Sequence, residues 1–113
     1  MKKSEVTIKP WGEFRQFTLN QESTIKTLSV NAGEILSLQT HTTREEYWYV
    51  LEGNPEITLD DNIFTTKPGD EIFVEQGQKH RIAAPTNNVV ILEIAYGHFD
   101  EDDIVRLEDK YNR

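Results

Sequence analysis

The sequence predicts an all-β protein, a barrel or jelly roll, that ends in a short C-terminal α-helix. Short runs rich in β-branched and aromatic residues recur along the chain. Turn-forming segments such as Asn31-Ala32-Gly33 and Pro68-Gly69-Asp70 separate these runs at nearly even intervals. Many short strands at this spacing are typical of barrels and sandwiches. The 113 residues suit one compact domain, residues 1–113, with a single core.

The strands follow from the apolar runs, since each is bounded by glycine, proline, asparagine or aspartate. The residues 54–68, between two long turn segments, leave room for one hairpin. The expected strands are 6–9, 14–19, 25–30, 35–38, 46–51, 56–59, 63–66, 71–74, 80–83 and 89–95.

The tail has a different pattern from the rest of the chain. Asp100 can cap a helix that runs to about Asn112, and acidic residues follow it, which suits the positive end of a helix. Ile104, Leu107 and Tyr111 then fall on one face, which can pack against the barrel. The sequence therefore predicts a helix at residues 100–112.

Charge and composition exclude several classes of function. The net charge of −8 argues against nucleic acid and against an anionic membrane as partners, because both require a basic surface. No apolar stretch approaches the length of a membrane span, and no signal peptide is recognised, so a cytoplasmic location is expected. Without cysteine, a metal could be held by nitrogen and oxygen ligands alone.

Strand parity places the polar residues of "SLQTHTTREEYW". Residues two apart in a strand share a face, so Gln39 and His41 can point at one spot if the strand extends that far. Glu46 then opens the next strand, on the same face as Trp48. A histidine in such a turn region can equally be an ordinary polar residue, so parity alone leaves both interpretations open.

The spacings resemble the two sequence motifs of the cupins. Gly33, Gln39, His41, Glu46 and Gly53 follow the first motif, with glutamine where many members have histidine. The second motif is matched, in a separate stretch, by Gly69, Glu75, Gly77 and His80, with Glu75 in place of the usual proline and Ala84 where an asparagine is common.

The resemblance implies a cupin-type double-stranded β-helix with a metal on its inner wall. Carried over by position, the implied ligands are Gln39, His41, Glu46 and His80. Two imidazoles, a carboxylate and an amide oxygen suit a borderline divalent ion with open positions. Zinc is the first choice, while manganese, iron, cobalt and nickel stay open.

A narrower resemblance covers the chain from Lys9 to Arg113. "KPWGEF", "LSLQTHTTREEYW" and the ending "EDDIVRLEDKYNR" are similar to the C-terminal isomerase domain of type II mannose-6-phosphate isomerases, which bifunctional members fuse to a mannose-1-phosphate guanylyltransferase. Here the domain would stand alone. The chain departs from the family pattern at Thr42, Thr43, Tyr47 and Asn112. None of these departures removes an implied ligand, so they bear on substrate identity more than on fold or metal.

This resemblance implies interconversion of mannose 6-phosphate and fructose 6-phosphate through an enediol. Arginine binds phosphate bidentately, and Arg106 and Arg44 are the expected phosphate-binding residues. Both have glutamates nearby in sequence, so a surface salt bridge is an equally open interpretation of each. No acid–base residue is assigned, because a solvated surface role suits the two candidates, Glu45 and His98, better than proton transfer. Alternatives are a non-catalytic cupin that binds a sugar or nucleotide sugar, and another metal-dependent cupin enzyme.

Pairing of two copies is also expected. Adjacent Tyr47 and Trp48 must face opposite ways in a strand, so one of them points away from the interior or into another subunit. Small cupins commonly pair through strands and such aromatic residues, so the resemblance implies a homodimer. A small phosphorylated sugar is the expected ligand.

Overall fold

The computed structural model describes residues 4–112, and this part of the chain contains no helix. Its strands form a hairpin and two larger sheets. The strands are β1 (Glu5–Lys9), β2 (Gly12–Gln16), β3 (Ser23–Val30), β4 (Leu38–Thr40), β5 (Glu46–Glu52), β6 (Glu56–Leu59), β7 (Asn62–Thr65), β8 (Glu71–Val74), β9 (His80–Ala83), β10 (Val89–Tyr96) and β11 (Val105–Glu108).

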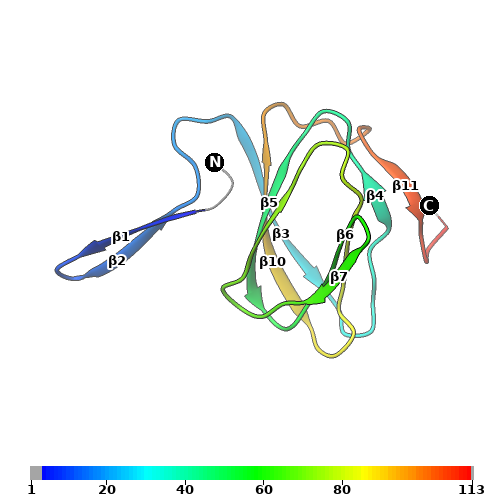
Figure 1. The fold of residues 1–113 in the computed structure, drawn as a ribbon, viewed down its shortest axis with the longest axis horizontal. Helices are drawn as coiled ribbons and strands as arrows, with labels where there is room; N and C mark the ends of the chain where they lie inside the picture. Colours follow the sequence, from blue (N-terminus) through cyan, green and yellow to red (C-terminus); the bar gives the residue numbers. More distant parts are fainter. Residues whose placement is uncertain (1–3, 113) are drawn as a thin grey trace.

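Two sheets face each other and enclose the core (Figure 1). One has the order β3-β10-β5-β8 and the other β11-β4-β9-β6-β7, and all described pairings are antiparallel. A single cluster of buried apolar residues draws on both sheets, with Trp48 and Ile91 from one and Ile57 and Ile82 from the other. The predicted all-β class is confirmed, as is the single hairpin, β6–β7, between the two motifs.

The predicted C-terminal helix is wrong. Residues 100–104 form turns, and β11 then pairs with β4, with Arg106 opposite Gln39. Two causes favour the strand over the helix. Ile104 and Val105 are β-branched, and β4 has an open edge whose backbone groups β11 satisfies. Asp103 does not act as a helix cap, because its carboxylate accepts hydrogen bonds from the Thr42-Thr43 segment.

Two strand boundaries also differ from the expected ones. The strand expected at 35–38 lies at Leu38–Thr40, and Ile35 makes an isolated bridge to Ala83. The strand expected at 14–19 lies at Gly12–Gln16, where it pairs with β1. The shift of β4 matters for function, because it brings His41 to the first position after the strand.

Tyr47 and Trp48 point to opposite sides of β5, as predicted, yet both are buried. Trp48 lies in the core. Tyr47 lies on the outer side of its sheet, where the ring of Phe17 packs at 5.9 Å and Ser4 accepts a hydrogen bond from its hydroxyl group at 3.3 Å. The segment that follows the β1–β2 hairpin thus covers the outer face of β5. The pKa of Tyr47 is raised, mainly by burial.

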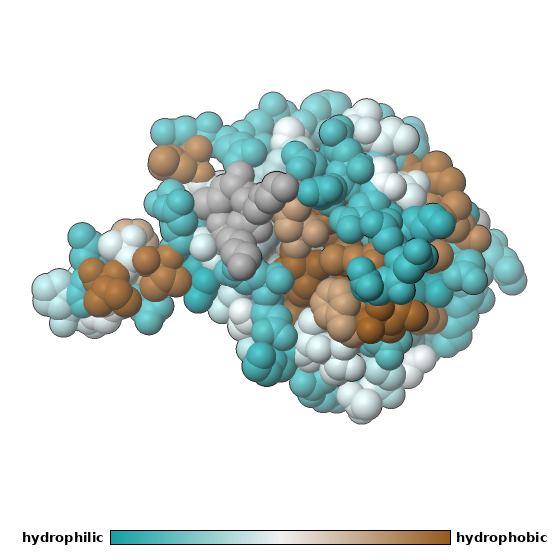
Figure 2. All heavy atoms as spheres, in the orientation of Figure 1, coloured by the Kyte–Doolittle hydropathy of each residue, from teal (hydrophilic) through white to brown (hydrophobic). Residues whose placement is uncertain are grey.

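The β1–β2 hairpin itself extends away from the two sheets and pairs with neither (Figure 1). Figure 2 shows brown, hydrophobic spheres on the projecting arm. The large apolar and aromatic side chains of the hairpin are exposed. They are Val6, Ile8, Trp11 and Phe14. Residues 4–112 contain no helix with the length and apolar character that a membrane crossing requires.

Candidate metal centre and adjoining cavity

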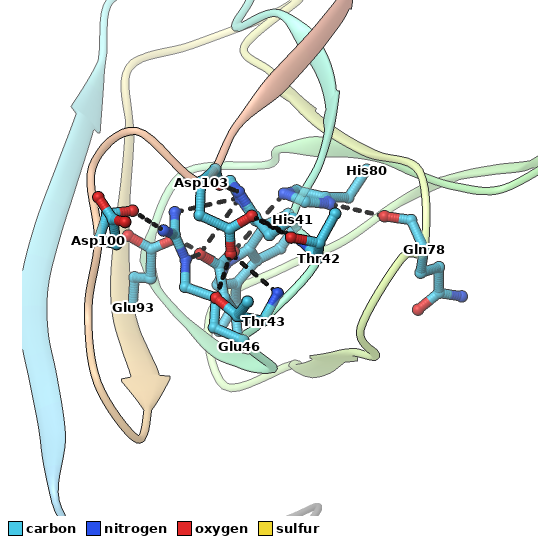
Figure 3. A network of polar contacts seen from close by, with 11 residues as sticks. His41, Thr42, Thr43, Glu46, Gln78, His80, Glu93, Asp100 and Asp103 are labelled. Carbon is cyan, nitrogen blue, oxygen red and sulfur yellow. Dashed lines mark hydrogen bonds and ion pairs between the residues drawn. The ribbon is translucent and has the colours of Figure 1, made fainter.

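Three buried side chains from different strands meet between the sheets. His41 follows β4, Glu46 opens β5 and His80 opens β9. Nε2 of His41 lies 3.5 Å from Oε2 of Glu46, and Nε2 of His80 lies 3.6 Å from Oε1 of the same carboxylate. The three potential ligand atoms all lie within 4.8 Å of one another. Figure 3 shows the three side chains close together.

Backbone carbonyl groups fix the tautomer of each imidazole. Nδ1 of His41 donates to the carbonyl oxygen of Asp103 at 2.6 Å, and Nδ1 of His80 donates to that of Gln78 at 2.9 Å. A carbonyl oxygen can only accept, so in a neutral ring the lone pair lies on Nε2, which faces Glu46. Burial lowers the pKa of His41 and lowers that of His80 to about 4, which keeps both rings neutral at pH 7.

Two acceptor atoms in this cluster have no hydrogen-bond partner among the described residues. They are Oε1 of Glu46 and Nε2 of His80, both buried. Two lone pairs that face each other across 3.6 Å in a buried site carry a large desolvation cost. A divalent cation removes that cost, and two imidazoles with a carboxylate are a donor set that zinc and similar ions bind. The residues present therefore fit a metal ion.

Gln39, the fourth predicted ligand, lies beside the cluster. It is the Cα partner of His80 across the β4–β9 pair and lines the adjoining cavity. Within residues 4–112 its amide makes no hydrogen bond with His41, Glu46 or His80. A ligand role for Gln39 remains a prediction.

The cluster adjoins a cavity of about 500 Å³, a volume within the usual range of small-molecule sites. His41 and Gln39 lie in its wall, so a bound ion could face the space. The charged side chains of the lining balance in number: Lys26, Arg44 and Arg106 against Glu93, Glu101 and Asp102.

The two arginines predicted to bind phosphate line the same cavity but differ in their contacts. Arg106 projects from β11 and is exposed. Arg44 is only 8% exposed. Its guanidinium donates through Nε to Oε2 of Glu46 at 3.0 Å, through Nη1 to the carbonyl oxygen of Asp100 at 3.0 Å, and through Nη2 to Nε2 of His41 at 3.2 Å.

Glu93 is a cavity residue that the sequence reasoning missed. Its side chain is buried in the wall, and Nε1 of Trp48 donates to it at 3.4 Å. Burial and the neighbouring Glu46 carboxylate raise the pKa of Glu93 to about 7. A signal was present, because a glutamate interrupts the apolar run "VVILEIAY" on the same face as the core residue Ile91. Lys26 was missed as well, since strand pattern alone does not show which cavity a lysine borders.

The two sequence candidates for proton transfer, Glu45 and His98, do not line the cavity. Glu45 is half-buried, and its carbonyl oxygen accepts from the backbone of Tyr96. His98 is exposed in the connection after β10. Neither side chain belongs to the lining described above.

Thr42 and Thr43 bind the tail to the loop that follows His41. The backbone N–H and hydroxyl groups of both threonines donate to the two carboxylate oxygens of Asp103, at 2.5 to 2.9 Å. These four hydrogen bonds hold the pKa of Asp103 well below its usual range. The same residue offers its carbonyl oxygen to His41, so one tail residue contacts three consecutive positions (Figure 3).

Comparison with known proteins places these features in a family. The family described as "Mannose-6-phosphate isomerase C-terminal" matches residues 1–109. The xanthan biosynthesis protein XanB of Xanthomonas campestris is 34% identical over 107 residues, which are 93% of this chain and 23% of XanB. The mannose-1-phosphate guanylyltransferase of Escherichia coli is 31% identical over 93% of this chain and 22% of that protein. The chain thus spans less than a quarter of the length of these relatives.

A solved structure confirms the architecture. A Klebsiella pneumoniae protein with a double-stranded β-helix domain superposes with a TM-score of 0.68 at 16% identity, over 82% of this chain and 80% of that one. At this identity the likeness speaks for the fold alone. The predicted cupin-type double-stranded β-helix is confirmed.

Proposed function

The chain belongs to the family of the mannose-6-phosphate isomerase C-terminal domain, and on that premise we propose that it is a metal-dependent sugar-phosphate isomerase. The proposed reaction interconverts mannose 6-phosphate and fructose 6-phosphate by moving a proton between C1 and C2 of the open-chain sugar. The observation that carries the proposal is the buried His41-Glu46-His80 cluster, with its two unpartnered acceptor atoms, beside a cavity lined by arginines.

His41, Glu46 and His80 would hold the ion, with Gln39 as the proposed fourth ligand, and zinc is the proposed metal. When bound, a divalent ion polarises the sugar carbonyl and stabilises negative charge on the enediolate oxygens. The carbonyl oxygens of Asp103 and Gln78 set the tautomers of His41 and His80. The lone pairs of both Nε2 atoms therefore already face Glu46, where the ion would bind.

The cavity supplies the remaining requirements of an isomerase. The backbone of Arg106 pairs with Gln39, but its guanidinium makes no hydrogen bond or ion pair within residues 4–112 and is therefore available to a phosphate group. Arg44 has five N–H donors, of which three have partners, leaving two for an anion. The reaction also needs a group that carries a proton, and Glu93 is the buried carboxyl group of the cavity lining outside the ligand cluster.

A coupled assay for fructose 6-phosphate formed from mannose 6-phosphate, with and without a chelator, tests the proposal. We expect turnover that chelation abolishes and one divalent ion restores. His80→Ala should lose both metal and turnover, while His98→Ala, which removes an exposed imidazole, serves as the matched control. Bound metal without turnover of any hexose or pentose phosphate would favour a non-catalytic sugar-binding or nucleotide-sugar-binding cupin. Turnover of an unrelated substrate would favour another metal-dependent cupin enzyme.

A further inference from the structure

Arg44 occupies atoms that a metal ion would need. Its Nη2–H group points at Nε2 of His41 at 3.2 Å, and its Nε–H group points at Oε2 of Glu46 at 3.0 Å. Both acceptors belong to the proposed ligand cluster. The guanidinium cation therefore already neutralises part of the negative charge that a divalent ion would meet.

The Arg44 guanidinium and a divalent metal ion cannot both bind Nε2 of His41. The Asp103 carbonyl oxygen accepts from Nδ1, so the neutral ring has one lone pair, on Nε2. In this structure that lone pair accepts the hydrogen bond from Arg44. A metal ion coordinated through Nε2 needs the same lone pair, and so Arg44 must release His41 when the ion binds.

Other contacts determine where the released guanidinium can go. Nη1 of Arg44 donates to the carbonyl oxygen of Asp100, and Cζ lies 4.5 Å from the centre of the Phe99 ring. Neither contact involves a ligand residue, so both can persist when His41 and Glu46 turn to an ion. The side chain borders the cavity, where Lys26 contacts the same Phe99 ring at 4.1 Å and Arg106 projects from β11. N–H groups of Arg44 that leave His41 and Glu46 therefore have the cavity beside them.

We propose that Arg44 exchanges between two partners: it holds His41 and Glu46 until a divalent cation binds there, and it then turns into the cavity to bind the phosphate group of a sugar phosphate. The anion-binding half of this inference rests on the proposed function, whereas the exchange at His41 does not. The exchange makes ion binding favour anion binding, and by linkage the anion favours the ion. It also keeps the buried Glu46 carboxylate paired in both situations, which avoids the cost of an isolated buried charge.

The affinity for a divalent ion distinguishes the exchange of Arg44 from a role in which Arg44 only orients Glu46. Chelator-treated protein is titrated calorimetrically with Zn²⁺ in a buffer free of phosphate, as wild type and as Arg44→Met. If Arg44 competes for the lone pair, its removal tightens Zn²⁺ binding by about 10-fold or more, since a charge-assisted hydrogen bond no longer has to break. If Arg44 merely orients Glu46, the same variant weakens binding by about 10- to 100-fold.

Arg81→Met is the matched control. Arg81 also uses its guanidinium in structural contacts, with the carbonyl oxygen of Leu36 and with Glu108, but it touches no proposed ligand. Its loss should leave Zn²⁺ affinity at the wild-type value. Equal or weaker Zn²⁺ binding by Arg44→Met overturns the exchange alone. Failure of wild type to bind Zn²⁺, Mn²⁺, Fe²⁺, Co²⁺ or Ni²⁺ overturns both the exchange and the proposed function.

A second measurement uses the wild-type chain and does not depend on the variant folding. The Nε–H groups of Arg44 and Arg81 both donate to protein acceptors, so both should give protected ¹⁵N–¹H signals. Saturation with Zn²⁺ should shift the Arg44 signal or remove its protection and leave that of Arg81 unchanged. Inorganic phosphate added next should restore a protected Arg44 signal at a new position. An Arg44 signal that Zn²⁺ saturation leaves unchanged overturns the proposal.

Discussion

The chemistry of His80 depends on its burial. Its exposed fraction is 1%, and burial lowers its pKa to about 4 from the ordinary value of 6.5. The unfolded chain therefore binds a proton at pH 5 that the folded chain does not bind. Stability rises with pH wherever the unfolded state binds more protons. The contribution of His80 to the free energy of unfolding is therefore complete above about pH 6.5 and is lost progressively as the pH falls to about 4.

We predict that a chelator-treated Glu93→Gln variant loses stability between pH 6.5 and 4.5. The substitution is needed because the raised pKa of the Glu93 carboxyl group, about 7, acts in the opposite direction over the same range. Since one pKa unit corresponds to about 1.4 kcal/mol, His80 alone can account for a loss of up to about 3 kcal/mol, and the lowered pKa of His41 acts in the same direction. Urea unfolding at a series of pH values measures this loss. Adding His98→Asn to this variant, at an exposed position, should leave the profile unchanged. A stability that is constant across this range would contradict the buried, neutral state of both rings.

Arg106 offers a second prediction at the scale of single residues. Replacement by alanine should raise the KM for mannose 6-phosphate by about 10- to 100-fold, the value of a charge-assisted hydrogen bond to an anion, and change kcat less. Lys110→Ala is a matched control, because Lys110 is a basic residue of the same tail that pairs with Glu34 outside the cavity. Steady-state kinetics on metal-loaded protein measure KM and kcat for both variants. An unchanged KM would assign phosphate binding elsewhere.

The residue types of the candidate site could be predicted from the sequence, but the contacts between their side chains could not. Strand parity paired Gln39 with His41, and the resemblance to the two cupin motifs added Glu46 and His80. The ion pair of Arg44 with Glu46 and the burial of Glu93 depend on the fold of the tail and of β10, which local patterns do not specify. Arg44 also donates to the carbonyl oxygen of Asp100, and Glu93 accepts from Nε1 of Trp48. Both contacts join residues far apart in the chain, so a single sequence does not reveal them.

Among the elements, the tail is where sequence and structure differ most. Its apolar spacing suits a helix, yet its backbone completes the ladder of β4. Thr42 and Thr43, at which the chain departs from the pattern of the family it resembles, contribute the donors that hold Asp103. Tertiary hydrogen bonds thus outweigh a local helix preference that is worth a few tenths of a kcal/mol per residue, roughly.

We predict that Asp103→Ala weakens Zn²⁺ binding by about 10-fold or more, since the loop that orients His41 loses its anchor. The free energy of unfolding should fall by about 1–2 kcal/mol, because the lost bonds are partly exposed. Calorimetric titration and urea unfolding measure the two effects. Asp70→Ala is the matched control: Asp70 likewise accepts from a backbone N–H and a side chain in a turn, at Lys67, far from the cluster. Equal Zn²⁺ affinities for both variants would limit Asp103 to a structural role.

For the whole molecule, the projecting β1–β2 arm is the feature to explain. A two-stranded hairpin alone is marginally stable in water, and this one exposes Val6, Ile8, Trp11 and Phe14. Between residues 5 and 16 two acidic and two basic side chains cancel, although the chain as a whole carries a net charge of −8. Two copies of such an acidic protein can therefore meet at the arm with little repulsion. We propose the arm as the interface of a homodimer.

The double variant Ile8→Ser/Trp11→Ser should convert the dimer to a monomer, as sedimentation equilibrium can measure. Ile63→Ser removes an apolar side chain of similar exposure on β7 and should leave the dimer intact. A wild-type chain that is monomeric at tens of micromolar, or a double variant that still pairs, would contradict the proposed interface.

The overall architecture could be predicted because it depends on repeated local signals. Nine of the ten expected strands overlap the observed ones by three residues or more, and the two sheets close over the inward-facing positions. The placement of the arm could not be predicted, since its strands have the same alternating pattern as strands that join a sheet.

The two tryptophans occupy opposite environments, and this gives the molecule two built-in optical reporters. Trp48 is 1% exposed and meets the His80 ring edge-on at 5.6 Å, while Trp11 is 72% exposed at the end of the arm. The buried indole emits at shorter wavelength than the exposed one, and a soluble quencher reaches the exposed one far more readily. Ion loading should therefore alter the blue part of the emission and self-association the red part, so that the two events can be followed separately in one cuvette.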